Sequence, residues 1–185
     1  MSKKLGIALF AVLLVSFVVA SRGAAQVTNG GFETGTFSGW TTSGADFIVL
    51  APHSGTYAAS LENGSISQTL VTVPGQSYTF NFWVLHSNSL LPNDFSASWN
   101  GTTLLNLVNQ GSSGYTDYAF TETATSSSTT ITFSSSNTQG PTAGYEFDLD
   151  DVSVTPVSEP MSLFLFGAGL VGMAVIGRRN RKEEA

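Results

Sequence analysis

The chain has 185 residues, no cysteine and a formal net charge of −6 at pH 7. All of its Lys and Arg residues lie near the two ends, and residues 23–177 contain none. Nucleic acids, heparin-like polymers and anionic lipid head groups need basic side chains to neutralise their charge. The central part of the chain therefore disfavours these partners and leaves neutral glycans, divalent cations and other proteins.

The N-terminal end has the three parts of a secretory signal peptide. Lys3 and Lys4 precede the apolar run 5–20, and small residues follow at 23–25. A basic region, an apolar region and a small-residue cleavage site are typical of export signals. We predict a signal peptide over residues 1–25, cleaved after Ala25; an uncleaved N-terminal anchor is the alternative.

Near the C-terminus, the apolar run 161–177 carries no charge and is followed by a basic tail at 178–182. The basic residues of this tail are Arg178, Arg179, Arg181 and Lys182. At about 1.5 Å per residue the run makes a helix of roughly 25 Å, slightly short of a ~30 Å hydrocarbon core. We predict a transmembrane helix over 161–177, whose basic end stays in the cytoplasm while residues 26–157 lie on the other side.

The residues before this helix are Ser158, Glu159 and Pro160. A Glu-Pro pair, an apolar glycine-containing helix and an Arg-rich end together resemble the PEP-CTERM sorting signal of exported bacterial proteins. The resemblance implies that residues 158–185 are read and cut by an exosortase, in a setting of exopolysaccharide or biofilm production. It also implies a membrane-anchored precursor that ends in the cell envelope, at the surface or outside the cell. Ser158 replaces the usual first proline, which leaves the cleavage position open, and an uncleaved anchor is the alternative.

Residues 26–157 alternate short β-branched and aromatic runs with Gly, Asn, Ser and Pro, which is typical of an all-β domain. We predict a two-sheet antiparallel sandwich, a jelly roll, with strands at 47–51, 57–61, 66–73, 77–86, 95–99, 103–108, 115–123, 129–134 and 146–155. Val73-Pro74-Gly75-Gln76 predicts a tight turn and Asn100-Gly101 a hairpin, because both need positive φ. Trp83 and Trp99 lie in alternating strands, and we predict that both are in the core.

Three segments are similar to the galactose-binding-like jelly rolls, which include several carbohydrate-binding module families. They are Thr28–Glu33, His53–Leu61 and Phe147–Val154. The resemblance implies a structural calcium held by Glu33 and Asp151, with backbone carbonyls near Asn29 and Ser54. The chemistry agrees, because calcium prefers hard oxygens and the Asp150-Asp151 pair has no basic residue nearby in sequence. Consecutive strand residues point to opposite faces, so only one of this pair is expected to face the metal. The alternative is that both acids are solvated or cap a turn.

Aromatic rings and amide side chains are the usual partners of sugars, and loop-proximal tyrosines are the best candidates for an exposed platform. These are Tyr115, Tyr118 and Tyr145. Catalysis is not predicted, because the chain has no Cys and no Gly-x-Ser-x-Gly, and carboxylates alone say little in so acidic a chain. His53 and His86 show no triad or metal-ligand spacing, and we expect them at the surface or as caps. Ice binding by the Thr121–Thr125 run is not supported, since no internal repeat is visible.

The sequence thus predicts an exported, membrane-sorted protein whose domain binds a neutral polysaccharide. The alternative is a structural or adhesion protein of the cell surface without a ligand. Exposed, coplanar aromatic residues would favour the first function, and burial of all three tryptophans would favour the second.

Overall fold

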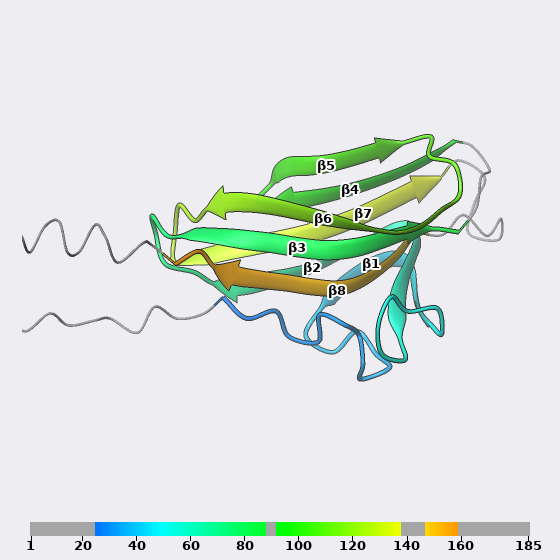
Figure 1. The fold of residues 1–185 in the computed structure, drawn as a ribbon, viewed down its shortest axis with the longest axis horizontal. Coiled ribbons are helices and arrows are strands. Elements are labelled where there is room, and N and C mark those ends of the chain that lie inside the picture. The colour runs from blue at the N-terminus through cyan, green and yellow to red at the C-terminus, as the bar shows by residue number, and fades with distance from the viewer. Residues whose placement is uncertain (1–24, 88–91, 138–146, 159–185) are drawn as a thin grey trace, which may run out of the picture.

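The computed structural model describes residues 25–87, 92–137 and 147–158, and these residues form an all-β domain (Figure 1). The strands are β1 (Thr41–Val49), β2 (Ala58–Val71), β3 (Ser77–His86), β4 (Asn93–Trp99), β5 (Thr102–Val108), β6 (Ser113–Thr123), β7 (Ser128–Asn137) and β8 (Phe147–Pro156). No helix in this part of the chain is long and apolar enough to cross a membrane. The predicted transmembrane helix and nearly all of the predicted signal peptide lie outside the described residues.

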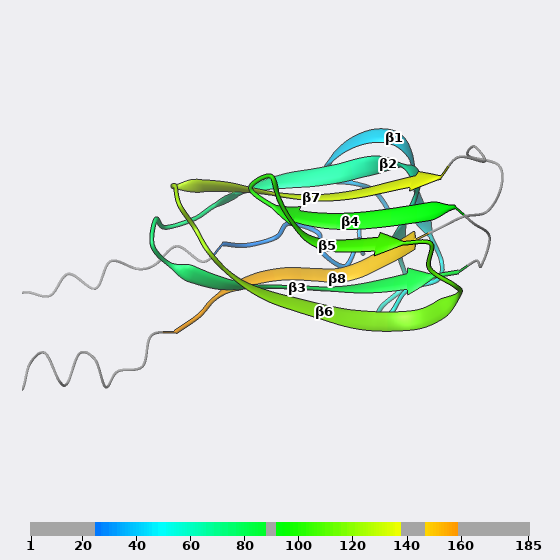
Figure 2. The same ribbon diagram turned by 90° about the horizontal axis from the view of Figure 1, so that it is seen from above.

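The strands form two layers that β2 joins. The hydrogen-bonded order is β5-β4-β7-β2-β8-β3-β6, with β1 added to β2, and every pair is antiparallel. Residues 65–71 of β2 pair with β7, whereas residues 59–61 pair with β8. We call β1-β2-β7-β4-β5 the five-strand layer and β8-β3-β6 the three-strand layer (Figure 2). The predicted antiparallel sandwich is confirmed.

The core lies between the layers and is rich in phenylalanine. Along β3, residues 78, 80, 82 and 84 are buried and the residues between them are half-buried, as their alternation predicts. Phe133 of β7 reaches across to Phe80 and Phe82, with ring centroids 5.6 and 4.9 Å apart. Such edge and tilted contacts are favourable for aromatic rings and fix the spacing of the layers.

One prediction about the strands is wrong, because the predicted runs 57–61 and 66–73 form a single strand, β2. Asn63 and Gly64 stay paired with β1, and Glu62 is the extra residue at the point where the register shifts, between Ala45 and Asp46 of β1. A β-bulge absorbs the extra residue and bends the strand, so no turn is needed. This bend lets β2 pass from one layer to the other. The described residues therefore hold eight strands, one fewer than predicted over the domain.

Both predicted turns are confirmed. Asn100 and Gly101 have φ values of 48° and 83°, as a two-residue hairpin requires. The Gln76 N–H donates to the Val73 carbonyl at 3.0 Å, and Gly75 between them has φ 80°.

Candidate functional site

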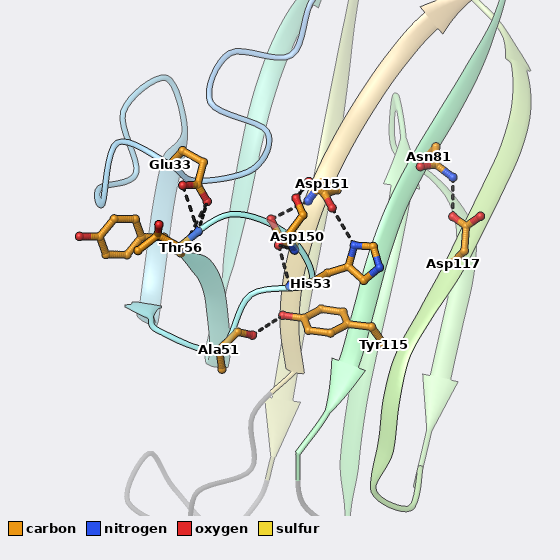
Figure 3. Close-up of polar contacts among 11 residues, drawn as sticks. Glu33, Ala51, His53, Thr56, Asn81, Tyr115, Asp117, Asp150 and Asp151 are labelled. Atoms are coloured by element: carbon orange, nitrogen blue, oxygen red, sulfur yellow. Dashed lines mark hydrogen bonds and ion pairs between the residues drawn. The ribbon is translucent and has the colours of Figure 1, made fainter.

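The loop between β1 and β2, residues 50–57, crosses the outer face of β8 and is held there by Asp150 (Figure 3). This carboxylate is fully buried, and its Oδ2 accepts the N–H groups of His53 at 2.8 Å and Ser54 at 3.0 Å. Its Oδ1 accepts the N–H of Asp151 at 2.7 Å. Burial raises the pKa of Asp150 above its usual range, while these amides act in the opposite direction. Asp150 thus receives three backbone donors, two of them from the loop, and holds the loop against β8.

Asp151 and two aromatic rings complete this attachment. Asp151 accepts the Ser54 hydroxyl on Oδ1 at 2.8 Å, and its Oδ2 lies 2.7 Å from Nδ1 of His53. The His53 ring stacks on Trp83 of β3, with centroids 3.8 Å apart and planes 12° from parallel. Tyr115 of β6 contacts the edge of His53 and donates its hydroxyl to the Ala51 carbonyl at 2.8 Å. We call His53, Trp83, Tyr115, Asp150 and Asp151 the loop anchor.

Alternation along a strand would turn Asp150 and Asp151 to opposite faces, but both contact the same loop. Asp151 has φ 50°, a left-handed value, and the β3–β8 register shifts between Asn81 and Trp83. A bulge interrupts the alternation of side chains along a strand. Both carboxylates therefore reach the loop from the same side of β8.

Glu33 holds the other end of the same loop. Its Oε1 accepts the N–H groups of Thr56 at 2.9 Å and Tyr57 at 3.1 Å, and Thr56 also lies 3.1 Å from Oε2. The two predicted calcium ligands, Glu33 and Asp151, thus already accept the loop's own donors. Among the described residues no group of three acidic, histidine or cysteine side chains could hold a metal. As placed, these residues do not form a ready calcium shell, and an ion would have to displace some of these bonds.

The predicted tyrosine platform is not brought together in the described residues. Tyr115 lies on the outer face of the three-strand layer, whereas Tyr118 turns inward and stacks on Phe82 at 5.8 Å. Tyr145 lies outside the described residues. Burial, and then the negative charges of Asp148, Asp150 and Asp151, raise the pKa of Tyr115. Beside Tyr115, Asn81 donates to Asp117 at 2.5 Å (Figure 3), so the exposed polar groups of this face also pair with each other.

The three tryptophans are all packed against the protein itself. Trp99 and Trp40 are 4% and 8% exposed, so the prediction for Trp99 is confirmed. The prediction for Trp83 is wrong, because it alternates with the core residues of β3 and points outward, where His53 covers it. His86 is also not at the surface: it is 2% exposed and stacks on Phe147.

The outer face of the five-strand layer has a different character. Strand pairing aligns short polar residues into two rows that run across all five strands: Thr41, Ser67, Thr132, Ser98 and Thr103 in one, and Ser43, Ser65, Ser134, Ser96 and Asn106 in the other. All ten are half-buried or exposed, and none is charged or aromatic. We call these ten residues the hydroxyl face.

Sequence reasoning missed the hydroxyl face. The available signal was the alternation of Ser or Thr with apolar residues in 65–71, 95–99 and 129–134. The rows arise only because pairing places Ser67 opposite Thr132 and Thr132 opposite Ser98. Such register depends on contacts far apart in sequence.

Residues 24–145 match the family model of a carbohydrate binding domain, CBM_4_9. The chain belongs to this carbohydrate binding domain family. Members of the family are non-catalytic binding domains, so the prediction that the domain is not an enzyme is confirmed. The match ends before β8, and the loop anchor's two aspartates lie beyond it. No curated protein sequence matches the chain.

Solved structures agree on the fold of this carbohydrate binding domain. The carbohydrate-binding module TmCBM61, solved with β-1,4-galactotriose, is 21% identical with a TM-score of 0.56, and the match covers 72% of this chain and 99% of that one. The xylan-binding domain from CBM 22 is 14% identical with a TM-score of 0.54, and the match covers 75% of this chain and 99% of that domain. The CBM22-1 and GH10 modules of Clostridium thermocellum xylanase 10B are 18% identical with a TM-score of 0.52, and the match covers 74% of this chain and 29% of that one. At these identities the likeness establishes a shared fold.

Proposed function

We propose that this protein is exported by residues 1–25, anchored by a helix over 161–177 and sorted through Ser158-Glu159-Pro160 by an exosortase. Its carbohydrate binding domain then acts in the cell envelope or extracellular matrix, where it binds a neutral polysaccharide. The family match supports glycan binding, and the absence of Lys and Arg from residues 23–177 favours a neutral glycan. The order of apolar and basic segments at the two ends supports export and sorting.

The hydroxyl face is the surface that best fits this function, because it is uncharged and open. Each Ser or Thr hydroxyl donates one hydrogen bond and accepts others, as sugar hydroxyls do. Strands lie about 4.8 Å apart, so the five strands spread these groups over about 19 Å. A surface of this length suits an extended polysaccharide better than a single sugar.

The loop anchor is a poorer glycan site. His53 covers Trp83, the Tyr115 hydroxyl is bonded to Ala51, and the nearby carboxylates already accept donors. A sugar would have to break these contacts before making its own. We therefore assign the loop anchor a structural role.

Calorimetric titration of the purified protein with a panel of neutral polysaccharides tests the proposal. Thr132→Asp and Ser67→Asp place charges in the hydroxyl face, and we expect at least about tenfold weaker binding, because an unpaired carboxylate must lose water when the glycan binds. Thr121→Asp adds the same charge to an exposed position of β6 on the other layer and is the matched control. Equal weakening by the control would exclude the hydroxyl face as the binding surface.

A structural or adhesion role without a ligand is the second candidate, and the packing of all three tryptophans favours it. Sugar rings commonly stack on aromatic residues, and no tryptophan stands free for this. If no polysaccharide in the panel produces heat or shifts the melting temperature, this second function replaces glycan binding.

Sorting is tested separately by replacing Arg178, Arg179, Arg181 and Lys182 with Gln. Because positive charge after an apolar segment fixes its orientation, we expect this variant to be mislocalised when cell fractions are immunoblotted. Replacement of Glu183 and Glu184 by Gln is the control, since it leaves the basic residues in place. Unchanged localisation of the first variant would argue against the sorting signal.

A further inference from the structure

The end of the sandwich at which the described chain leaves, at Ser158, is built from three segments. They are the β2–β3 turn, the β6–β7 turn and Val157, and hydrogen bonds tie them together. The Gly75 N–H donates to the Ala124 carbonyl at 2.7 Å, and the Thr72 N–H donates to the Ser127 carbonyl at 3.0 Å. We call residues 71–77, 124–128 and 157 the near pole; in Figure 1 it lies at the left-hand end, away from the 50–57 loop.

The near pole exposes apolar side chains. Val71 is 76% exposed, Val157 is 38% exposed and Val73 is 37% exposed. Pro74 stands beside Val73 and is also exposed. Single exposed apolar residues are common on protein surfaces, but these lie on segments that are bonded to one another.

The acidic residues are concentrated toward the other end of the strands. Nine described residues are acidic, and Glu122, which pairs with Tyr78, is the only one next to the near pole. The other eight lie on the remote halves of their strands or on the segments packed there: Glu33, Asp46, Glu62, Asp94, Asp117, Asp148, Asp150 and Asp151. The near pole itself carries no charged residue.

The fixed part of the chain extends almost to the predicted membrane helix. The Val157 N–H donates to the Ser77 carbonyl at 2.8 Å, and Gln76 donates to the Val157 carbonyl at 2.8 Å. Residues 158–160 alone separate Val157 from the predicted helix at 161–177. Three residues span at most about 11 Å when fully extended.

We infer that the near pole rests on the bilayer surface, with its valines against the lipid, while the tail is inserted. This inference depends on the membrane anchor proposed above. A tether this short keeps the pole at a high effective concentration near the lipid, so three valines are enough for contact. The acidic remote half then stands away from the negatively charged lipids, and the hydroxyl face rises from the membrane and stays accessible.

The absence of cysteine allows a direct test on the full-length protein in phosphatidylcholine vesicles. A fluorophore is attached to Thr125→Cys on the near pole or to Ser112→Cys in the β5–β6 loop at the remote end; both positions are exposed. A lipid-borne quencher in the head-group region should quench the Thr125→Cys label at least about twice as strongly. Equal quenching in protein that floats with the vesicles would overturn the inference but leave the anchor intact.

Two further variants identify the contact. Val71→Ser with Val73→Ser should reduce the quenching of the Thr125→Cys label, whereas Leu50→Ser with Val108→Ser, which removes exposed apolar residues at the remote end, should not. Unchanged quenching in the first pair would show that the valines do not touch lipid. Failure of the protein to float with vesicles would overturn both the anchor and this inference.

Discussion

The outer faces of the two layers differ, because a loop covers part of one and the other is open. On the three-strand layer, the 50–57 loop lies over β8 and is bonded to Asp150 and Asp151. On the five-strand layer, two rows of short polar residues stay half-buried or exposed. The difference teaches that aromatic and acidic residues, which look functional in the sequence, serve here to attach a loop. The plain Ser and Thr residues form an open surface, which is the one we propose for a ligand.

Among tests of this contrast, Asp150→Asn is expected to change the stability of the domain most. The amide has one acceptor oxygen, so it can keep the two loop donors but not the Asp151 N–H as well, and we expect a loss of about 1 to 3 kcal/mol in the free energy of unfolding. Thr132→Ala on the hydroxyl face should change it by less than about 0.5 kcal/mol. Urea denaturation of both variants measures this. Similar losses would mean that the two faces do not differ in structural role.

His53→Ala is expected to have the next largest effect. It removes the stack on Trp83 and the contact with Asp151, and a loss of about 1 to 2 kcal/mol in the free energy of unfolding follows. Glycan affinity should stay the same, because we propose the hydroxyl face, and not the loop anchor, as the binding surface. A variant of native stability that no longer binds glycan would move the binding site to the loop anchor.

Asp46, on β1 at the edge of the five-strand layer, gives a pH-dependent test. Burial raises its pKa from 3.8 to about 6, partly offset by the backbone of Ser43. Because the folded state holds this proton more tightly, stability falls as pH rises from about 4 through about 6. Asp46→Asn should therefore stabilise the domain at pH 7.5, by about 1 kcal/mol after allowing for its partial exposure to solvent, and give no gain at pH 4. Thermal melts at the two pH values measure this, and an equal gain at both would refute the charge-based explanation.

Calcium is expected to have the smallest effect. An ion at Glu33 and Asp151 would replace hydrogen bonds that the 50–57 loop already makes, so we expect a rise of only a few degrees in melting temperature. Melts with calcium and with a chelator, repeated on Asp151→Asn, measure it. A large rise in melting temperature would show that the loop anchor rearranges around the ion. No rise would show that calcium does not bind at Glu33 and Asp151.

Much of the fold could be predicted from the sequence, because it depends on local patterns. Strict alternation of apolar and polar residues predicted the bounds of β3 and its buried face, and the Asn100-Gly101 pair predicted a hairpin. Both features follow from backbone conformation over a few residues. The bend of β2 could not be predicted, because Asn63-Gly64 favours a turn unless a neighbouring strand pairs with it.

The sequence by itself determined the class of the protein: an all-β, acidic domain between an apolar N-terminal run and an apolar C-terminal run with a basic end. It also located the segments that meet at the 50–57 loop. Only the tertiary structure decided their roles, because a bulge at Asp151 turned two successive acids to one side and strand register placed Ser67, Thr132 and Ser98 in one row. Composition and local propensity act over a few residues, whereas register and bulges are fixed by pairing between strands far apart in the chain.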